Sequence, residues 1–148
     1  MQSPTGALAS SLESFHHIGF VVPLIDDAVQ GFVQALQAEW DGKIFHDPNQ
    51  VVRVTFLQSK IAGSPVLELV EPAGEKSPVI PFLKRGGGLH HLCYEVDDLE
   101  AQLQLSRAQG GITVRPPLPA VAFAGRRIAW VYTKNKLLLE YLERHKNL

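Results

Sequence analysis

The sequence predicts an α+β fold built from two copies of one βαβββ unit. The first observation is a repeated opening, because FHHIGFVV at residues 15–22 returns as LHHLCYEV at residues 89–96. The second is a repeated ending, because LELVE at residues 67–71 returns as LEYLE at residues 139–143. Each half therefore opens with a histidine-bearing strand and closes with a glutamate-bearing strand. Internal similarity of this kind is typical of a fold assembled from repeated units.

The composition is that of a globular protein without a strongly charged face. The chain has 148 residues, of which 45% are hydrophobic, and its formal net charge is -1. This balance argues against a nucleic-acid partner and against binding to an anionic membrane surface. No hydrophobic run is long enough to span a bilayer. The single cysteine, Cys93, has no partner for an internal disulfide, so we expect a cytoplasmic location.

The first unit is expected at residues 15–71, after a flexible leader at residues 1–14 that carries no secretion signal. Residues 15–22 predict a buried strand that ends at Pro23. Hydrophobic residues then recur with helical spacing at Val29, Phe32, Val33 and Leu36. Residues 52–58 alternate between hydrophobic and polar side chains, which is typical of a half-buried strand. Residues 66–70 form the closing strand.

A connector at residues 72–88 separates the two units. It is rich in proline and glycine, so we expect only a short helical stretch that ends at Arg85. In the second unit, residues 89–148, Asp98 is a candidate N-cap for a helix over residues 99–109. Residues 112–114 predict a short strand, which the prolines at 116, 117 and 119 should end. The last two strands are expected at residues 128–132 and 137–142.

Two histidines and two glutamates occupy equivalent positions in the two units: His17, His91, Glu68 and Glu140. The glutamates are flanked by hydrophobic residues that belong in the core, so the alternation of side chains turns both carboxylates to the other face. A carboxylate in a strand built for burial is costly unless it is paired or binds a metal. Units of this size bury too little surface alone, so they should pack side by side. We therefore predict that the four side chains converge between them.

Two imidazoles and two carboxylates suit a divalent transition metal such as Co, Ni, Zn, Mn or Fe(II). Four protein ligands leave two positions of an octahedral ion for a substrate with neighbouring oxygen atoms. Such an ion stabilises negative charge that develops on an enolate oxygen. Glu140 and Glu68 are then the candidate general bases for a proton on the adjacent carbon.

Other side chains allow a structural as well as a functional interpretation. Alternation leaves open which histidine of each pair faces inward, and we assign His16 and His90 to the opposite face as structural residues. Glu71 and Glu143 lie at strand ends, where we expect exposure to solvent. Cys93 shares the side-chain direction of His91 in a regular strand, so it either lines the pocket or, as we prefer, is a small buried hydrophobic residue. Four aromatic residues belong to the core or to a pocket, with core packing preferred: Trp40, Phe56, Phe123 and Trp130. Four basic residues bind a substrate anion or lie exposed: Arg126 and Arg127 and, less favoured, Lys84 and Arg85.

These residues resemble the ligand set of the vicinal oxygen chelate superfamily, which includes glyoxalase I, methylmalonyl-CoA epimerases, extradiol dioxygenases and the fosfomycin and bleomycin resistance proteins. The resemblance covers residues 15–143 as one domain and implies paired βαβββ modules with a metal in the cleft. The matching motifs are His-Ile-Gly at His17, Glu-Leu-Val-Glu-Pro at Glu68, His-His-Leu at His91 and Leu-Glu-Tyr at Glu140.

The middle third of the chain is most similar to the methylmalonyl-CoA epimerases, over residues 68–80, 82–91 and 95–98. That resemblance implies an acyl-CoA thioester as substrate and a homodimer. The chain departs from the epimerase pattern at the shortened loops around Gly125 and Thr133, where coenzyme A would be held, and at Arg53, where some epimerases carry an acidic residue.

Three functions fit this sequence. The first is a metal-dependent epimerase or isomerase that moves a proton next to a chelated carbonyl, as in the methylmalonyl-CoA epimerases. The second is a glyoxalase I-like lactoylglutathione lyase, which differs in how the substrate is held. The third is a non-catalytic drug-binding resistance protein, against which the intact ligand set argues. A dioxygenase fits less well, because its iron triad contains a single carboxylate.

Overall fold

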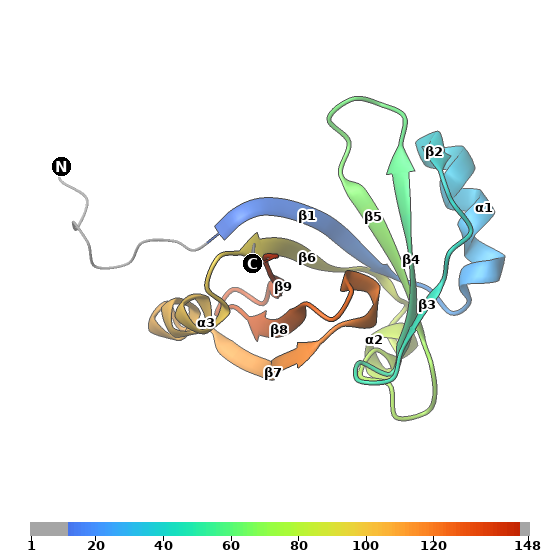
Figure 1. The fold of residues 1–148 in the computed structure, drawn as a ribbon. Coiled ribbons are helices and arrows are strands. Elements are labelled where there is room, and N and C mark those ends of the chain that lie inside the picture. The colour runs from blue at the N-terminus through green and yellow to red at the C-terminus, as the bar shows by residue number, and fades with distance from the viewer. Residues whose placement is uncertain (1–11, 146–148) are drawn as a thin grey trace.

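The computed structural model describes residues 12–145, which contain one curved nine-stranded sheet with helices packed on it (Figure 1). The first unit consists of β1 (Leu12–Val21), α1 (Ile25–Leu36), β2 (Ala38–Glu39), β3 (Phe45–Asp47), β4 (Val52–Ser59) and β5 (Val66–Pro72). The connector contains α2 (Ile80–Lys84). The second unit consists of β6 (Gly88–Val96), α3 (Leu99–Ala108), β7 (Ile112–Pro119), the 3-10 helix η1 (Val121–Phe123), β8 (Arg127–Tyr132) and β9 (Leu138–Glu143).

The strand order shows the duplication directly. It is β2-β4-β5-β1-β6-β9-β8-β7, with β3 paired to β4. The two opening strands, β1 and β6, pair antiparallel at the centre, and each has the closing strand of its own unit, β5 or β9, as a parallel neighbour. The predicted α+β fold of two paired units is therefore confirmed, with the units joined edge to edge through β1 and β6 (Figure 1).

The central register relates the two units by an approximate twofold axis. His17 lies opposite Cys93, and His91 lies opposite Gly19. His91 is the equivalent of His17 in the second unit, and Cys93 is the equivalent of Gly19. Exchanging the two units therefore turns the pair His17–Cys93 into the pair His91–Gly19. In the flanking parallel pairs, Gly19 is the neighbour of Glu68, and Cys93 is the neighbour of Glu140.

Each unit has its own core between helix and sheet, and further clusters cover the inner face. In the first unit Ile25 and Val29 of α1 pack on the sheet beside Leu57 and Leu69. In the second unit α3 packs on β6, β8 and β9, and its predicted cap is confirmed because the Asp98 carboxylate accepts a hydrogen bond from the Ala101 amide. The inner face carries one cluster around Val54 and Val70 and another around Ile128 and Leu142. The half-buried ring of Phe56 contacts both clusters.

Several element boundaries differ from the sequence-based expectation. Strand β1 begins at Leu12, inside the expected leader, and the rest of that leader lies outside the described residues. The two- and three-residue strands β2 and β3 were not predicted, because such short segments carry no periodic pattern. The expected break after residue 114 is wrong, because β7 continues to Pro119. Proline is tolerated there because β7 is an edge strand that pairs only with β8, with two register shifts.

Candidate metal centre

Four neighbouring strands at the middle of the sheet bring the four repeated residues together. His17, Glu68, His91 and Glu140 come from β1, β5, β6 and β9. Their exposed fractions are 0%, 5%, 4% and 2%, so all four polar side chains are removed from solvent. The convergence predicted from the repeat is present, because adjacent strands carry these residues close to the twofold axis.

The four side chains present one atom each to a common centre. The Nε2 atoms of His17 and His91 are 3.2 Å apart. Glu140 Oε1 lies 3.1 Å from His17 Nε2 and 3.3 Å from His91 Nε2. Glu68 Oε1 lies 3.4 Å and 3.3 Å from the same two nitrogens. All four ligand atoms fall within 4.8 Å of one another.

This arrangement fits a metal ion better than it fits hydrogen bonds among the four groups. Despite its short distances to both imidazoles, Glu140 Oε1 is buried and has no hydrogen-bond partner of acceptable geometry among the described residues. Neighbouring ligands of an ion bound at about 2.1 Å are about 3 Å apart in octahedral and about 3.4 Å apart in tetrahedral geometry. The observed separations match that spacing, so the cluster could hold a divalent metal.

Mutual charge, rather than burial, controls protonation of these groups when no metal is bound. Burial alone lowers the pKa of His17, but the carboxylates of Glu68 and Glu140 outweigh it and raise that pKa to about 10. The pKa of His91 is raised for the same reason. Burial alone raises the pKa of Glu140 and of Glu68, but the two imidazoles outweigh it and lower both. Protons therefore sit on the imidazoles in place of the metal.

Aromatic rings hold the two imidazoles from the sides. Phe123 stacks on the His17 ring at a centroid distance of 5.9 Å, and Phe56 meets that ring edge-on at 5.6 Å. Trp130 meets the His91 ring edge-on at 4.7 Å. Rotation of either ligand ring would collide with these neighbours, so the Nε2 atoms are held toward the centre.

The assignment of His16 and His90 to the opposite face is wrong. His16 Nδ1 lies 2.8 Å from His17 Nδ1, and His90 Nδ1 lies 2.8 Å from His91 Nδ1. The reason is a pair of irregularities in the β1–β6 register, which shifts between the pairs at Phe15 and His17 and again between those at Gly19 and Phe20. A β-bulge interrupts the alternation of side chains on which the assignment depended.

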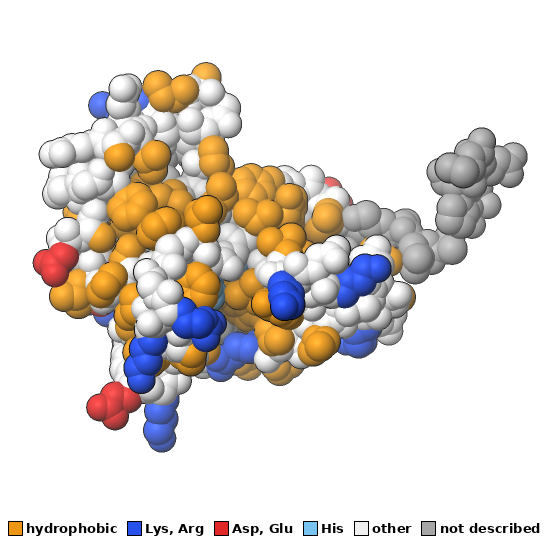
Figure 2. Space-filling model, turned by 180° about the vertical axis from the view of Figure 1, so that it is seen from behind, with side chains coloured by type: hydrophobic (Ala, Val, Ile, Leu, Met, Phe, Trp, Pro, Cys, Tyr) orange, Lys and Arg blue, Asp and Glu red, His pale blue; other side chains and the backbone are white. Residues whose placement is uncertain are grey.

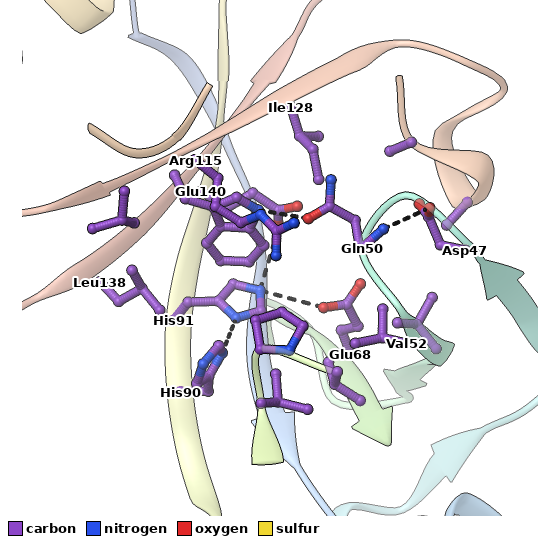
Figure 3. A pocket seen from close by; sticks show the side chains of 18 of the residues that line it. Asp47, Gln50, Val52, Glu68, His90, His91, Arg115, Ile128, Leu138 and Glu140 are labelled. Carbon is purple, nitrogen blue, oxygen red and sulfur yellow. Dashed lines mark hydrogen bonds and ion pairs between the residues drawn. The ribbon is translucent and has the colours of Figure 1, made fainter. Parts of the chain in front are cut away.

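A cavity of about 570 Å³ opens on one side of the four residues, and Figure 3 shows Glu68, Glu140, His90 and His91 on its wall. Most of the remaining wall is hydrophobic, including Val52, Val54, Val70, Val79, Ile128 and Leu138. Phe123 and Trp130 also line it, and both belong to the core cluster around Cys93 and Leu142 as well, so core packing and pocket lining hold together for these two. The preference for core packing holds for Trp40, which packs on the α1 cluster, and Cys93 is fully buried as expected.

Arg115 is the only lysine or arginine among the described residues that line the cavity. Within residues 12–145 no carboxylate forms an ion pair with it, unlike the arginines at positions 53, 126, 127 and 144. Arg115 was not among the residues predicted for the site, because it follows the point where β7 was expected to end. Arg115 pairs with Trp130 in the β7–β8 ladder, and no local pattern in the sequence reports that pairing.

Two arginines that were candidates for substrate binding are engaged elsewhere. Arg126 lies 3.0 Å from Glu95. Arg127 lies 2.8 Å from Glu143 and 2.9 Å from Glu100. Glu143 is thus paired rather than merely solvated, and neither arginine faces the cavity with a free guanidinium group.

Glu71 also differs from the expectation, because it is buried rather than exposed. Its Oε1 accepts a hydrogen bond of 3.1 Å from the Ile25 amide at the start of α1 and one of 3.4 Å from Arg53. The residue before this helix, Leu24, has no capping side chain, so Glu71 supplies the missing acceptor from a distant strand.

With this geometry in place, comparison with known families gives the class of the protein. Residues 16–130 match the model of the Glyoxalase/Bleomycin resistance protein/Dioxygenase superfamily, and the chain belongs to that superfamily. It is 29% identical over 122 residues to the ethylmalonyl-CoA/methylmalonyl-CoA epimerase of Cereibacter sphaeroides, which covers 81% of this chain and 88% of the relative. The chain spans about half the length of the mitochondrial methylmalonyl-CoA epimerases that it also matches.

Solved structures point to the same kind of protein. Methylmalonyl-CoA epimerase from Mycobacterium tuberculosis superposes with a TM-score of 0.77 at 26% identity, covering 99% of this chain and 94% of that one. A methylmalonyl-CoA epimerase in complex with methylmalonyl-CoA and NH4+ superposes with a TM-score of 0.73 at 26% identity, covering 90% of this chain and 95% of that one. The similarity to these epimerases supports an epimerase-like enzyme.

Among residues 12–145, none of the helices has the length and hydrophobicity that a membrane span requires.

Proposed function

We propose that this protein is a divalent-metal-dependent epimerase that inverts the carbon between the thioester carbonyl and the carboxylate of a short-chain acyl-CoA, such as methylmalonyl-CoA or ethylmalonyl-CoA. The observation that carries the proposal is the pair of buried carboxylates, Glu68 and Glu140, which reach one centre from opposite units beside a hydrophobic cavity. The names of the relatives support the substrate class.

Inversion needs one group that removes a proton and a second that returns one from the other side. Three carboxylates line the cavity, but that of Asp47 accepts hydrogen bonds from the amides of Asn49, Gln50 and Val121 and is thereby occupied. Glu68 and Glu140 remain. They stand on β5 and β9, on either side of the twofold axis, and so approach a carbon held between them from opposite faces.

The proton balance of the reaction closes with these two residues and solvent. One glutamate takes the proton from the substrate carbon, and the other returns a proton to the opposite face. Since the pKa values of both are lowered in the metal-free protein, the donating glutamate takes its proton from solvent in each turnover. His17, Glu68, His91 and Glu140 would hold the metal, which when bound would supply electrostatic stabilisation for charge that develops on the substrate oxygen. Exclusion of water by the hydrophobic wall strengthens that stabilisation.

Arg115 and the cavity wall account for recognition of the substrate. The hydrophobic wall suits the methyl or ethyl branch of the acyl group. The unpaired guanidinium of Arg115, on the same wall as Glu140 in Figure 3, suits an anionic group, either the substrate carboxylate or a phosphate of coenzyme A. Lysine and arginine side chains also border the broad hydrophobic area on the face shown in Figure 2.

The test is solvent exchange at the substrate C2 in D₂O, measured by mass spectrometry with cobalt-loaded protein and methylmalonyl-CoA or ethylmalonyl-CoA. Wild-type protein should incorporate deuterium, and Glu140→Gln and Glu68→Gln should lower the rate by about 100-fold or more. Glu75→Gln changes an exposed glutamate and serves as the control. If the loaded wild-type protein shows no exchange with either thioester, the epimerase proposal is wrong.

The lyase alternative predicts thioester formation from a glutathione hemithioacetal, which ultraviolet absorbance detects directly. The drug-binding alternative predicts neither reaction.

The homodimer and the cytoplasmic location stay predictions. Gel filtration of the purified protein would test the first, and cell fractionation would test the second.

A further inference from the structure

Two of the three irregularities in the β1–β6 register are β-bulges at equivalent positions of the two units. In the β1–β6 pair, Phe15 faces Tyr94 and His17 faces Cys93, which leaves His16 as the extra residue. On the other strand Gly19 faces His91 and Phe20 faces Leu89, which leaves His90 as the extra residue. Each bulge therefore stands directly before a histidine of the metal centre. Bulges commonly re-aim a side chain next to a functional site.

Each bulge brings two consecutive imidazoles into the same contact. The two Nδ1 atoms are 2.8 Å apart in both pairs. The rings stand edge to face, with centroids 5.1 Å apart and interplanar angles of 80° and 84°. Both bulge histidines are half-buried and packed against an aromatic ring, His16 against Phe123 and His90 against Phe82. The same geometry thus occurs twice, in two different local sequences.

The contact has only one arrangement of protons that is compatible with metal binding. His17 and His91 direct Nε2 toward the two glutamates, so Nε2 is the atom that coordinates. A neutral imidazole that coordinates through Nε2 carries its proton on Nδ1. That N–H points at the Nδ1 atom of the bulge histidine, which must then accept the hydrogen bond and carry its own proton on Nε2.

We propose that His16 and His90 are positioning residues that accept the Nδ1–H of His17 and His91 and so fix the tautomer and ring orientation with which these two bind a divalent metal. The inference rests on the proposed metal-dependent function, because it assigns a role toward the same centre. Partners of this kind typically account for a 10–100-fold change in metal affinity. In this protein the partner is a second imidazole supplied by the preceding residue.

The first experiment compares two substitutions of similar shape. His16→Leu removes the acceptor, whereas His16→Asn keeps an oxygen or nitrogen close to the position of Nδ1. Zinc affinity is measured by competition with a chromophoric chelator on the full chain. We expect about 10–100-fold weaker binding for His16→Leu and recovery of most of that loss in His16→Asn. The same pair at His90 repeats the test in the other unit, and thermal unfolding without metal verifies that each variant folds.

The second experiment needs no variant. Long-range ¹H–¹⁵N correlation spectra of the zinc-loaded wild-type protein report the tautomer of each imidazole. Protons on Nδ1 of His17 and His91 and on Nε2 of His16 and His90 are expected. Equal weakening by Leu and Asn would indicate packing alone, and a proton on Nδ1 of His16 and His90 would also overturn the inference. Failure of wild-type protein to bind zinc would instead contradict the proposed function.

Discussion

Gly19 lies directly opposite His91 in the β1–β6 pair, and the imidazole of His91 occupies the space where a side chain on Gly19 would begin. A Cβ atom at this position would overlap the ring itself rather than the end of a flexible chain. The absence of a side chain at residue 19 is therefore a condition for the metal centre, and it leads to a first prediction.

Gly19→Ala should displace His91 and weaken metal binding by at least about 10-fold, because one of four ligands loses its orientation. Isothermal titration with Co²⁺ measures the effect. Gly31→Ala is the matched control, because apart from the backbone of helix α1 itself and the adjoining residues no atom lies within 4 Å of the added methyl group. That control should keep its metal affinity and gain about 0.5–1 kcal/mol of stability from the better helix propensity. Unchanged affinity in Gly19→Ala would contradict the close contact.

Metal binding should release protons well above neutral pH. The pKa of His17 is raised to about 10 and that of His91 is raised as well, so both imidazoles in metal-free protein hold their second proton to a higher pH than a free imidazole, and His17 still carries it at pH 8. Coordination requires neutral imidazole, so each metal ion displaces these protons and binds more tightly as the pH rises toward 10. Calorimetric titrations at pH 8 in buffers of different ionisation enthalpy count the protons released. Imidazoles of ordinary pKa would release almost none at this pH.

The same shifts give the metal-free protein a pH-dependent stability. The raised pKa of His17 contributes stability that is fully present below its unfolded value of 6.5 and is lost as the pH rises through the folded value of about 10. The lowered pKa values of Glu68 and Glu140 contribute stability above 4.5 that is lost on acidification. Urea unfolding without metal should therefore show a lower midpoint at pH 9.5 than at pH 6.5. His17→Gln should flatten that difference.

Glu71→Ala should destabilise the first unit by about 1–2 kcal/mol, because the Ile25 amide at the start of α1 loses its acceptor. Loss of the ion pair with Arg53 contributes little, because that arginine is partly exposed. Urea unfolding of the metal-loaded protein gives the difference in free energy. Glu75→Ala removes an exposed glutamate from the connector and should leave the midpoint unchanged. Equal effects of the two substitutions would contradict the capping role.

Arg115→Gln should raise the KM for an acyl-CoA thioester by about 10-fold while kcat stays nearly constant, because in its proposed role the guanidinium binds an anionic group of the substrate and transfers no proton. Arg107→Gln removes an equal charge from the exposed side of α3 and is the control. To separate the two possible anions, the measurement is repeated with a pantetheine thioester that lacks the nucleotide phosphates. If Arg115→Gln still raises the KM for the pantetheine thioester, the guanidinium binds the substrate carboxylate. If the rise in KM disappears with that substrate, the guanidinium binds a phosphate of coenzyme A. No change in KM with either substrate would exclude Arg115 from recognition.

The large features of the fold and the centre could be predicted from the repeat. Helix α1 follows the hydrophobic spacing of Val29, Phe32 and Val33, and Asp98 caps α3 as its sequence position indicates. Periodicity reports such elements because each one is a local pattern. It did not report β2 or β3, or the continuation of β7 through its prolines, because those strands exist through pairing with β4 and β8.

By itself, the sequence determined that the fold is duplicated and that two histidines and two glutamates hold equivalent places in the two copies. Equivalent positions on adjacent strands must meet near the twofold axis, so the convergence of His17 and His91 with the two glutamates followed from the pattern. Only the tertiary structure decided that His16 and His90 contact the imidazoles of His17 and His91 and that Arg115 lines the cavity. Both depend on which residue of one strand faces which residue of another, and hydrogen bonding between distant segments sets that register.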